Sequence, residues 1–133
     1  MAETNAQIVE RACARFKEVG EPEPSLVGPG FVWDMTNMAS WPEQPVFEGR
    51  EGMVRFLAEW AAAWEDWRME LEEVHEAGDK VVAVLRQNAR ARASGLPVEM
   101  TFAQVWTMRD GSYRRMDMYS DVGEALAFAG VPR

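Results

Sequence analysis

The stretch that decides the fold is residues 80–120, KVVAVLRQNARARASGLPVEMTFAQVWTMRDGSYRRMDMYS. It holds three runs rich in apolar residues, 80–93, 96–108 and 112–120, separated by the turn signals Ser94-Gly95 and Arg109-Asp110-Gly111. A further run, 66–76, comes before them and ends at Ala77-Gly78-Asp79. Short turns of this composition join antiparallel neighbours. The sequence therefore predicts a four-stranded antiparallel meander.

The run at 66–76 carries a break in its alternation. Trp67, Met69 and Leu71 share one parity, whereas Val74 takes the other. A one-residue insertion of this kind is typical of a β-bulge, which bends a sheet. We expect the bulge at Glu72-Glu73.

Helical spacing appears on both sides of the meander. A first helix is expected from Thr4 or Asn5 to about Gly20, and a second over residues 50–65, with apolar residues at three- and four-residue spacing. A short last helix is expected at 122–129. Between the first two helices, 31–35 is predicted as a short strand and 36–49 as a long loop of the kind that serves as a lid. The fold class is α+β, with helices covering one concave face of a bent sheet.

Composition favours one packed domain, residues 1–133. Of the 133 residues 47% are hydrophobic and 27% charged, which is close to the globular average. The formal net charge of −8 repels phosphate backbones and anionic membrane surfaces, so neither nucleic acid nor a membrane is an expected partner. No segment approaches the length of a signal-peptide core or a membrane span, and a cytoplasmic location is expected.

One cysteine and one histidine cannot supply the ligands of a structural zinc site. Metal chemistry would have to be carboxylate-based. We expect no metal and no cofactor. Cys13 lies on the apolar face of the first helix and is interpreted as a core residue. Asp121 is interpreted as the N-cap of the last helix, and Asp117 as an outward-facing ion-pair residue between Met116 and Met118.

Gln104 is the one polar side chain on an otherwise apolar strand face. It shares that face with Phe102 and Trp106 in the run 96–108. A buried amide needs hydrogen-bond partners. Gln104 is therefore either tied to neighbouring groups or available to a ligand, and the sequence leaves both open.

On the run 80–93 the even positions change from apolar to polar. Val82 and Val84 are followed by Arg86 and Asn88. We expect this parity to face the interior and its polar end to form a cavity mouth. Arg86 and Asn88 would there contact a substrate oxygen, or alternatively pair with carboxylates at the end of the sheet.

Asp34 is a candidate general base. It shares parity with Val32, which we expect to turn its carboxylate inward. A desolvated carboxyl has a raised pKa, which suits a base near neutral pH. The alternative is a turn or cap role. Trp33 and Trp41 flank the predicted lid and are candidate pocket-lining side chains.

A resemblance extends over nearly the whole chain. The segments Val32-Trp33-Asp34-Met35, Phe47-Glu48-Gly49-Arg50-Glu51-Gly52 and Gln104-Val105-Trp106-Thr107-Met108-Arg109-Asp110-Gly111 resemble the SnoaL-like branch of the nuclear transport factor 2-like superfamily. The resemblance implies a cone-shaped fold, a bent antiparallel sheet wrapped around helices and enclosing a pocket. This fold hosts isomerases, cyclases, epoxide hydrolases and binding proteins.

Two groups of enzymes in this superfamily suggest residue roles. Asp34 is similar in position to the general-base aspartate of ketosteroid isomerases, a system in which such pKa tuning is well established, and Gln104 falls where they place an oxyanion-hole acid. Their oxyanion tyrosine has no counterpart near Phe16. The limonene epoxide hydrolases of this superfamily activate a water molecule with a set of residues that includes an arginine and two aspartates. Arg86 matches that arginine, but Asn88 and Met118 stand where the two aspartates would be. This difference argues against an epoxide hydrolase mechanism.

The leading functional hypothesis is a pocket enzyme of isomerase or cyclase type acting on a largely apolar carbonyl compound, such as a polyketide or steroid-like molecule. Asp34 would remove a proton alpha to the carbonyl, and Gln104 would donate a hydrogen bond to the enolate oxygen. The alternative is a non-catalytic protein that binds a small apolar ligand. The expected substrate-binding side chains are Trp33, Trp41, Arg86, Asn88, Phe102, Trp106 and Met118.

A homodimer is also expected. The run 81–85 is apolar on both parities, so its convex face needs a cover. A second copy would bury Val81, Ala83 and Leu85 together with Ala103 and Val105. The competing explanation is that the last helix folds back across this face.

Overall fold

The computed structural model describes residues 3–19, 24–38 and 46–131. Its elements, in chain order, are α1 (Asn5–Val19), the 3-10 helix η1 (Pro24–Leu26), β1 (Val27–Asn37), β2 (Val46–Glu48), α2 (Gly49–Ala63), β3 (Trp64–Ala77), β4 (Lys80–Ala91), β5 (Pro97–Arg109), β6 (Ser112–Tyr119) and α3 (Val122–Ala129). The predicted α+β class is confirmed.

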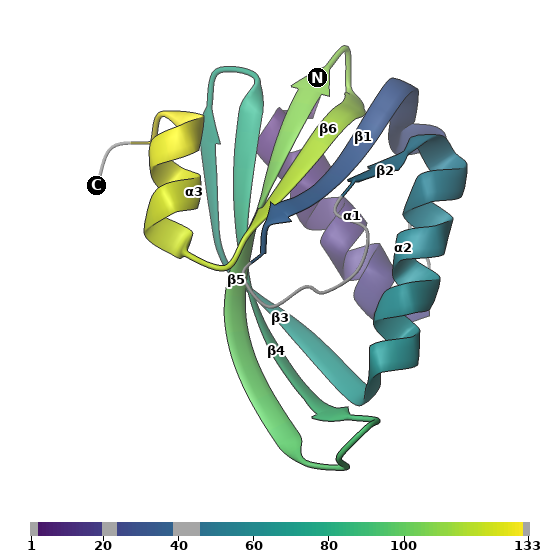
Figure 1. Cartoon of the computed structure of the whole chain (residues 1–133). Coiled ribbons are helices and arrows are strands. Elements are labelled where there is room, and N and C mark those ends of the chain that lie inside the picture. The colour runs from purple at the N-terminus through teal and green to yellow at the C-terminus, as the bar shows by residue number, and fades with distance from the viewer. Residues whose placement is uncertain (1–2, 20–23, 39–45, 132–133) are drawn as a thin grey trace.

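The six strands form one curved sheet in the order β2-β1-β6-β5-β4-β3 (Figure 1). Strands β3 to β6 pair antiparallel in sequence order, so the predicted meander is confirmed. β1 is longer than the expected strand and lies parallel to β6, with Trp33 opposite Met116. This parallel pair brings the segment after α1 beside the end of the chain, a long-range contact that no local pattern specifies.

The bend predicted from the broken alternation is present in β3. Its pairing with β4 shifts by one residue between Leu71 and Glu73, which confirms the bulge. A second shift lies between Glu65 and Arg68, where Asp66 has a positive φ of 52°. Both irregularities increase the local twist, and β3 curves toward the helices.

The helix ends follow their capping residues. The Thr4 hydroxyl accepts from the Gln7 backbone N–H at 3.1 Å while the Gln7 side chain accepts from the Thr4 N–H at 2.9 Å, a reciprocal cap for α1. Asp121 accepts from the Glu124 N–H at 2.9 Å and caps α3, as expected. α3 ends at Gly130, whose φ of 81° is the left-handed conformation that glycine favours.

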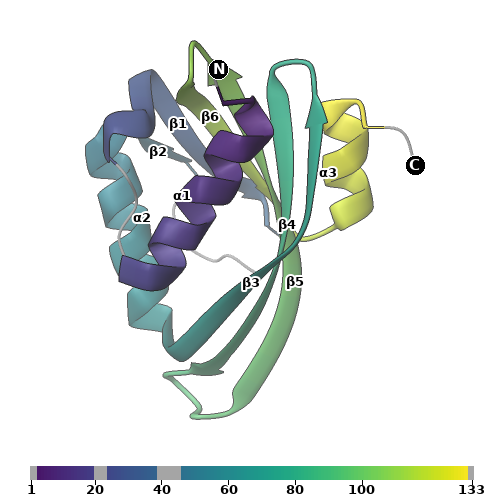
Figure 2. The ribbon, with the colours of Figure 1, turned by 180° about the vertical axis from the view of Figure 1, so that it is seen from behind.

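The helices lie on both sides of the sheet. α1 and α2 lie against the concave face and α3 against the opposite face, as Figures 1 and 2 show from front and back. The apolar stripe of α2 is confirmed, since Met53, Phe56 and Trp60 are buried. None of the described helices is long and apolar enough to span a membrane.

The two faces of β4 are the reverse of those expected. Val81, Ala83 and Leu85 pack in the core under α1 and α2. Val82 and Val84 pack with α3. The reason is register: Leu85 lies opposite Phe102 and Ala83 opposite Gln104, and directly opposite residues of an antiparallel pair share a face. When the side chains at odd and at even positions of a strand are all apolar, its sequence does not show which set faces the core.

The outer face of β4 and β5 is covered by the chain itself. Ala125, Leu126 and Ala129 of α3 form a buried cluster with Val82, Val84, Ala103 and Val105. This is the arrangement given above as the competing explanation, and it removes the reason for expecting a second copy there. A homodimer stays a prediction, but its contact surface cannot be the one formed by Val81, Ala83 and Leu85.

Candidate functional site

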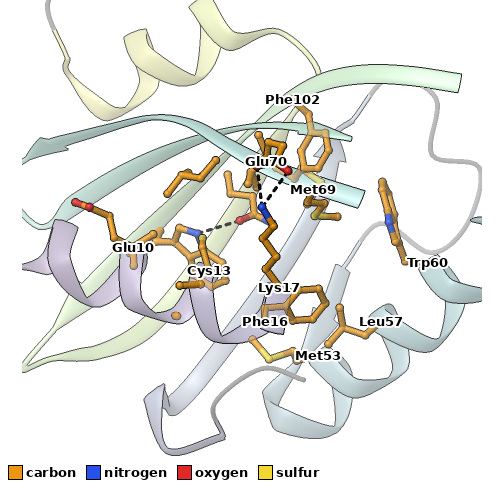
Figure 3. A pocket seen from close by; sticks show the side chains of 18 of the residues that line it. Glu10, Cys13, Phe16, Lys17, Met53, Leu57, Trp60, Met69, Glu70 and Phe102 are labelled. Carbon is orange, nitrogen blue, oxygen red and sulfur yellow. Dashed lines mark hydrogen bonds and ion pairs between the residues drawn. The ribbon is translucent and has the colours of Figure 1, made fainter. Parts of the chain in front are cut away.

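A cavity of about 640 Å³ lies between the concave face of the sheet and the two helices α1 and α2. Figure 3 shows Cys13, Phe16 and Lys17 of α1 on one side, Met69, Glu70 and Phe102 of the sheet on another, and Leu57 and Trp60 where α2 bounds it. A volume of this size is typical of small-molecule sites.

Aromatic rings form a continuous wall around the cavity. Trp106 contacts Tyr113 with ring centroids 4.2 Å apart and Trp33 at 5.7 Å. Trp33 stacks on Phe56 at 4.5 Å. Phe56 contacts Trp60 at 5.7 Å, and Trp60 contacts Phe102 at 6.0 Å. We call these six side chains the aromatic wall: Trp33, Phe56, Trp60, Phe102, Trp106 and Tyr113, all of which line the cavity.

Gln104 brings an amide group to this apolar cavity. It lines the cavity from β5, and its Oε1 accepts from the indole Nε1 of Trp106 at 3.2 Å. An indole N–H can only donate, so the amide oxygen faces it and Nε2 points elsewhere. Nε2 makes no hydrogen bond to any described residue and is not a fully buried atom. Gln104 therefore offers a neutral donor to a molecule in the cavity.

Charged side chains line the cavity where α1 meets β3. The Lys17 ammonium lies 2.9 Å from both carboxylate oxygens of Glu70 (Figure 3). The hydrogen bond and positive charge of Lys17 lower the pKa of Glu70. Beside this ion pair, Phe16 meets Trp67 edge to face with centroids 5.9 Å apart. These contacts hold α1 over the cavity.

Cys13 lines the cavity from α1. Burial, assisted by the negative charge of Glu10, raises the pKa of its thiol to about 11. The thiolate is the reactive form of cysteine, so Cys13 is an inert thiol at neutral pH.

The expectation that Asp34 points into the cavity is wrong. Its carboxylate lies 2.6 Å from the Arg115 guanidinium and accepts from the Thr36 backbone N–H at 2.8 Å, and it is not among the cavity-lining residues. Arg115 also donates to both carboxylate oxygens of Asp117 at 3.0 Å. The physical reason is alternation: Trp33 lines the cavity, so the next side chain on β1 projects from the other face. Asp117 lies in an ion pair, as expected, but is buried.

Arg86 and Asn88 also lie away from the cavity. They share the outer parity of Val82 and Val84, so the expected cavity mouth at this end of β4 is wrong. Arg86 pairs with Glu72, with its Nε 3.2 Å from a carboxylate oxygen, and Asn88 is exposed. For Arg86, the structure agrees with the alternative given above, in which it pairs with a carboxylate.

The structure brings together a subset of the expected site residues. Those that line the cavity are Trp33, Phe102, Gln104, Trp106 and Met118. Trp41 lies outside the described residues, together with the rest of 39–45, which is half of the predicted lid; of the other half, 36–37 belong to β1 and 46–48 to β2. Phe16 and Trp60 also line the cavity, although their positions indicated only core packing. An apolar stripe on a helix has the same pattern whether it packs on a neighbour or bounds a cavity.

Among the described ranges, no group of three or more His, Cys, Asp or Glu side chains is placed to hold a metal ion.

Comparison with known proteins gives one family and a consistent fold. The model of the SnoaL-like domain matches residues 24–116. No curated protein matches the chain. The chain is similar in structure to TerC co-crystallised with polyporic acid, at 24% identity over 94% of this chain and 96% of that one, with a TM-score of 0.72.

Two further solved structures agree with this fold. An NTF2-like protein from Burkholderia thailandensis is 24% identical over 98% of this chain and 100% of its own, with a TM-score of 0.75. A putative SnoaL-like polyketide cyclase from Mesorhizobium loti is 16% identical over 88% of this chain and 99% of its own, with a TM-score of 0.72. The predicted nuclear transport factor 2-like fold is thereby confirmed.

Proposed function

The chain belongs to the SnoaL-like domain family, and from that premise we propose that its cavity binds a small, largely apolar molecule carrying a hydrogen-bond acceptor such as a ketone oxygen. The observation that carries the proposal is the combination of the aromatic wall with the unpaired Nε2 of Gln104. Apolar surface supplies most of the affinity, and the amide fixes the orientation of the ligand.

The distribution of charged residues around the cavity supports a ligand that is uncharged where it contacts the aromatic wall. The aromatic wall and Gln104 carry no formal charge, and the charged residues that line the cavity, Glu10, Lys17, Arg68 and Glu70, come from α1 and β3. Placing an ionised group against the wall would cost its hydration without a compensating ion pair. A neighbour of the same fold was crystallised with polyporic acid, which supports a small organic molecule as the class of ligand.

Binding is favoured over proton abstraction. An isomerase or cyclase would use Gln104 to stabilise an enolate oxygen, and would need a base beside the same ligand. Asp34 is separated from the cavity by the sheet. Glu70, which does line the cavity, is held by Lys17 with a lowered pKa, which makes it a weak base. A cyclase role, suggested by the name of the Mesorhizobium protein, remains the second candidate and would rely on Glu10.

A matched ligand pair tests the proposal. Fluorene and 9-fluorenone have nearly the same shape, but only the second has a ketone oxygen. We expect saturable one-to-one quenching of tryptophan fluorescence by 9-fluorenone, and about tenfold weaker binding in Gln104→Leu because one hydrogen bond is lost. Fluorene affinity should be nearly the same in both proteins. Equal losses for the two ligands, or saturable binding of neither, would contradict the proposal.

A further inference from the structure

A second buried glutamine, Gln87, contacts the aromatic wall but does not line the cavity. Gln87 lies on β4 with the inward parity of Leu85 and is fully buried. Its Oε1 accepts from the indole Nε1 of Trp60 at 2.8 Å. Its Nε2 has no hydrogen-bond partner among the described residues. Because the indole can only donate, the amide cannot be reversed to pair Nε2 with Trp60 instead.

This amide is costly where it lies. Its neighbours across the strands are both methionines, Met69 on β3 and Met100 on β5. A third methionine at this position would fill a similar length without leaving a buried donor unpaired, and such a donor lowers stability. Within the described part of the chain, the amide makes one hydrogen bond, which it accepts from Trp60. A role that involves Trp60 therefore accounts for the amide better than core packing does.

Trp60 is a cavity residue, whereas Gln87 is not among the lining residues. Figure 3 shows Trp60 at the side of the cavity that α2 bounds. Trp60 joins the aromatic wall through Phe56 and Phe102. In the same wall the indole of Trp106 is bonded to Gln104. Two of the wall's indoles are thus each fixed by a glutamine oxygen.

We propose that Gln87 is a positioning residue: it fixes the indole of Trp60 and thereby makes the cavity select flat, rigid aromatic ketones over flexible chains. The inference rests on the proposed function and adds the shape of the ligand to it. A wall already held in one arrangement loses little entropy when a rigid ligand packs on it. Without the bond to Gln87, the Trp60 indole keeps its ring contacts but loses the hydrogen bond that sets its orientation. That advantage is then lost for a rigid ligand, whereas a flexible ligand adjusts to the changed wall.

The hydrogen bond is tested first, without any ligand. The Nε1–H resonance of Trp60 is identified by its disappearance in Trp60→Phe, and its exchange with solvent deuterium is followed by NMR. We expect slow exchange in the parent protein and exchange at least about tenfold faster in Gln87→Met, because the hydrogen bond that Gln87 accepts is then absent. Unchanged exchange in Gln87→Met would overturn the proposal.

The selectivity is tested with two ketones of equal carbon and oxygen count, 9-fluorenone and 2-tridecanone. In Gln87→Met we expect about tenfold weaker binding of 9-fluorenone and less than about twofold change for 2-tridecanone. Val84→Ala, on the outer face of the same strand, is the control for general destabilisation and should shift neither affinity. Equal losses for both ketones in Gln87→Met would overturn the proposal.

A double-mutant cycle shows whether Gln87 acts through Trp60. Trp60→Phe should reproduce the loss of 9-fluorenone affinity, and adding Gln87→Met to it should cause little further loss. A full additional tenfold loss would mean that Gln87 acts by another route, and would overturn the proposal. If the parent protein binds neither ketone, the proposed function and the selectivity both fail, while the exchange measurement still decides whether Gln87 fixes Trp60.

Discussion

Trp33 and Asp34 are adjacent on β1 and project to opposite faces of the sheet. The Trp33 indole lines the cavity and stacks on Phe56, whereas the Asp34 carboxylate is paired with Arg115 at 2.6 Å on the other side. Consecutive side chains of a regular strand project to opposite faces of the sheet. Parity and the family resemblance made Asp34 a site candidate, and the predicted lid made Trp33 one. Of the two, only Trp33 lines the cavity.

Replacing Asp34 tests this division directly. We expect Asp34→Asn to leave 9-fluorenone affinity unchanged and to lower the free energy of unfolding by about 1 kcal/mol or less, because its ion-pair partner Arg115 is partly exposed. Urea unfolding measures the second quantity. Asp110→Asn, in the exposed β5–β6 turn, is the matched control and should change neither. A tenfold loss of ligand affinity in Asp34→Asn would place the carboxylate at the cavity after all.

Asp117 predicts a pH dependence of stability. Burial raises its pKa, and the charge and hydrogen bond of Arg115 only partly oppose this. A carboxyl whose pKa is higher in the folded than in the unfolded protein holds its proton more tightly when folded. Its contribution to stability is therefore full below the unfolded value of about 3.9 and is lost as the pH rises through the folded value.

The measurement is a comparison of thermal unfolding in the parent and Asp117→Asn. The difference in stability between the two should move in favour of the parent as the pH is lowered from about 6 toward 4. A difference that moves toward Asp117→Asn over this range would show that the ion pair with Arg115 outweighs burial.

Cys13 predicts slow alkylation. With a pKa of about 11, its thiolate fraction near pH 7.5 is on the order of a hundredfold below that of an ordinary cysteine. Iodoacetamide labelling, followed by mass spectrometry, should be correspondingly slow and should accelerate up to about pH 11. Saturating 9-fluorenone should slow it further, because Cys13 lines the cavity. Labelling at the rate of free cysteine would contradict the raised pKa of this partly buried thiol.

The position of α3 over the outer face of β4 and β5 leads to a prediction about stability and self-association. Leu126→Asp should lower the free energy of unfolding by about 3 kcal/mol or more, because Leu126 belongs to the buried apolar cluster that α3 forms with β4 and β5. Light scattering should show increased self-association, since an apolar sheet face becomes accessible. Ala127→Asp, on the exposed side of the same helix, is the control. A soluble Leu126→Asp protein of unchanged stability and mass would contradict the covering role of α3.

Alternation and turn residues predicted much of the fold. The meander, the bulge at 72–73, the cap at Asp121 and the inward face of Phe102, Gln104 and Trp106 all rest on local patterns, and the structure contains each of them. These features depend on a few consecutive residues, whose side-chain directions follow from the period of the strand or helix.

The errors arose where a face had to be chosen without a local signal. β4 is apolar on both parities, and β1 has apolar or aromatic residues at both Val32 and Trp33. Their orientation is set by partners distant in sequence, Phe102 for Leu85 and Met116 for Trp33. Gln87 was missed for the same reason: once Leu85 is known to face inward, the polar residue two positions later follows.

A crystal structure of the protein soaked with 9-fluorenone tests the central claim most directly. The quantity is the distance between the ketone oxygen and Nε2 of Gln104. We predict a ligand in the cavity with this distance at about 2.9–3.2 Å, and with the bond from Trp106 to Oε1 of Gln104 retained. A ligand bound on the outer face beside Asp34 and Arg115, or in the cavity with its oxygen turned away from Gln104, would contradict the account.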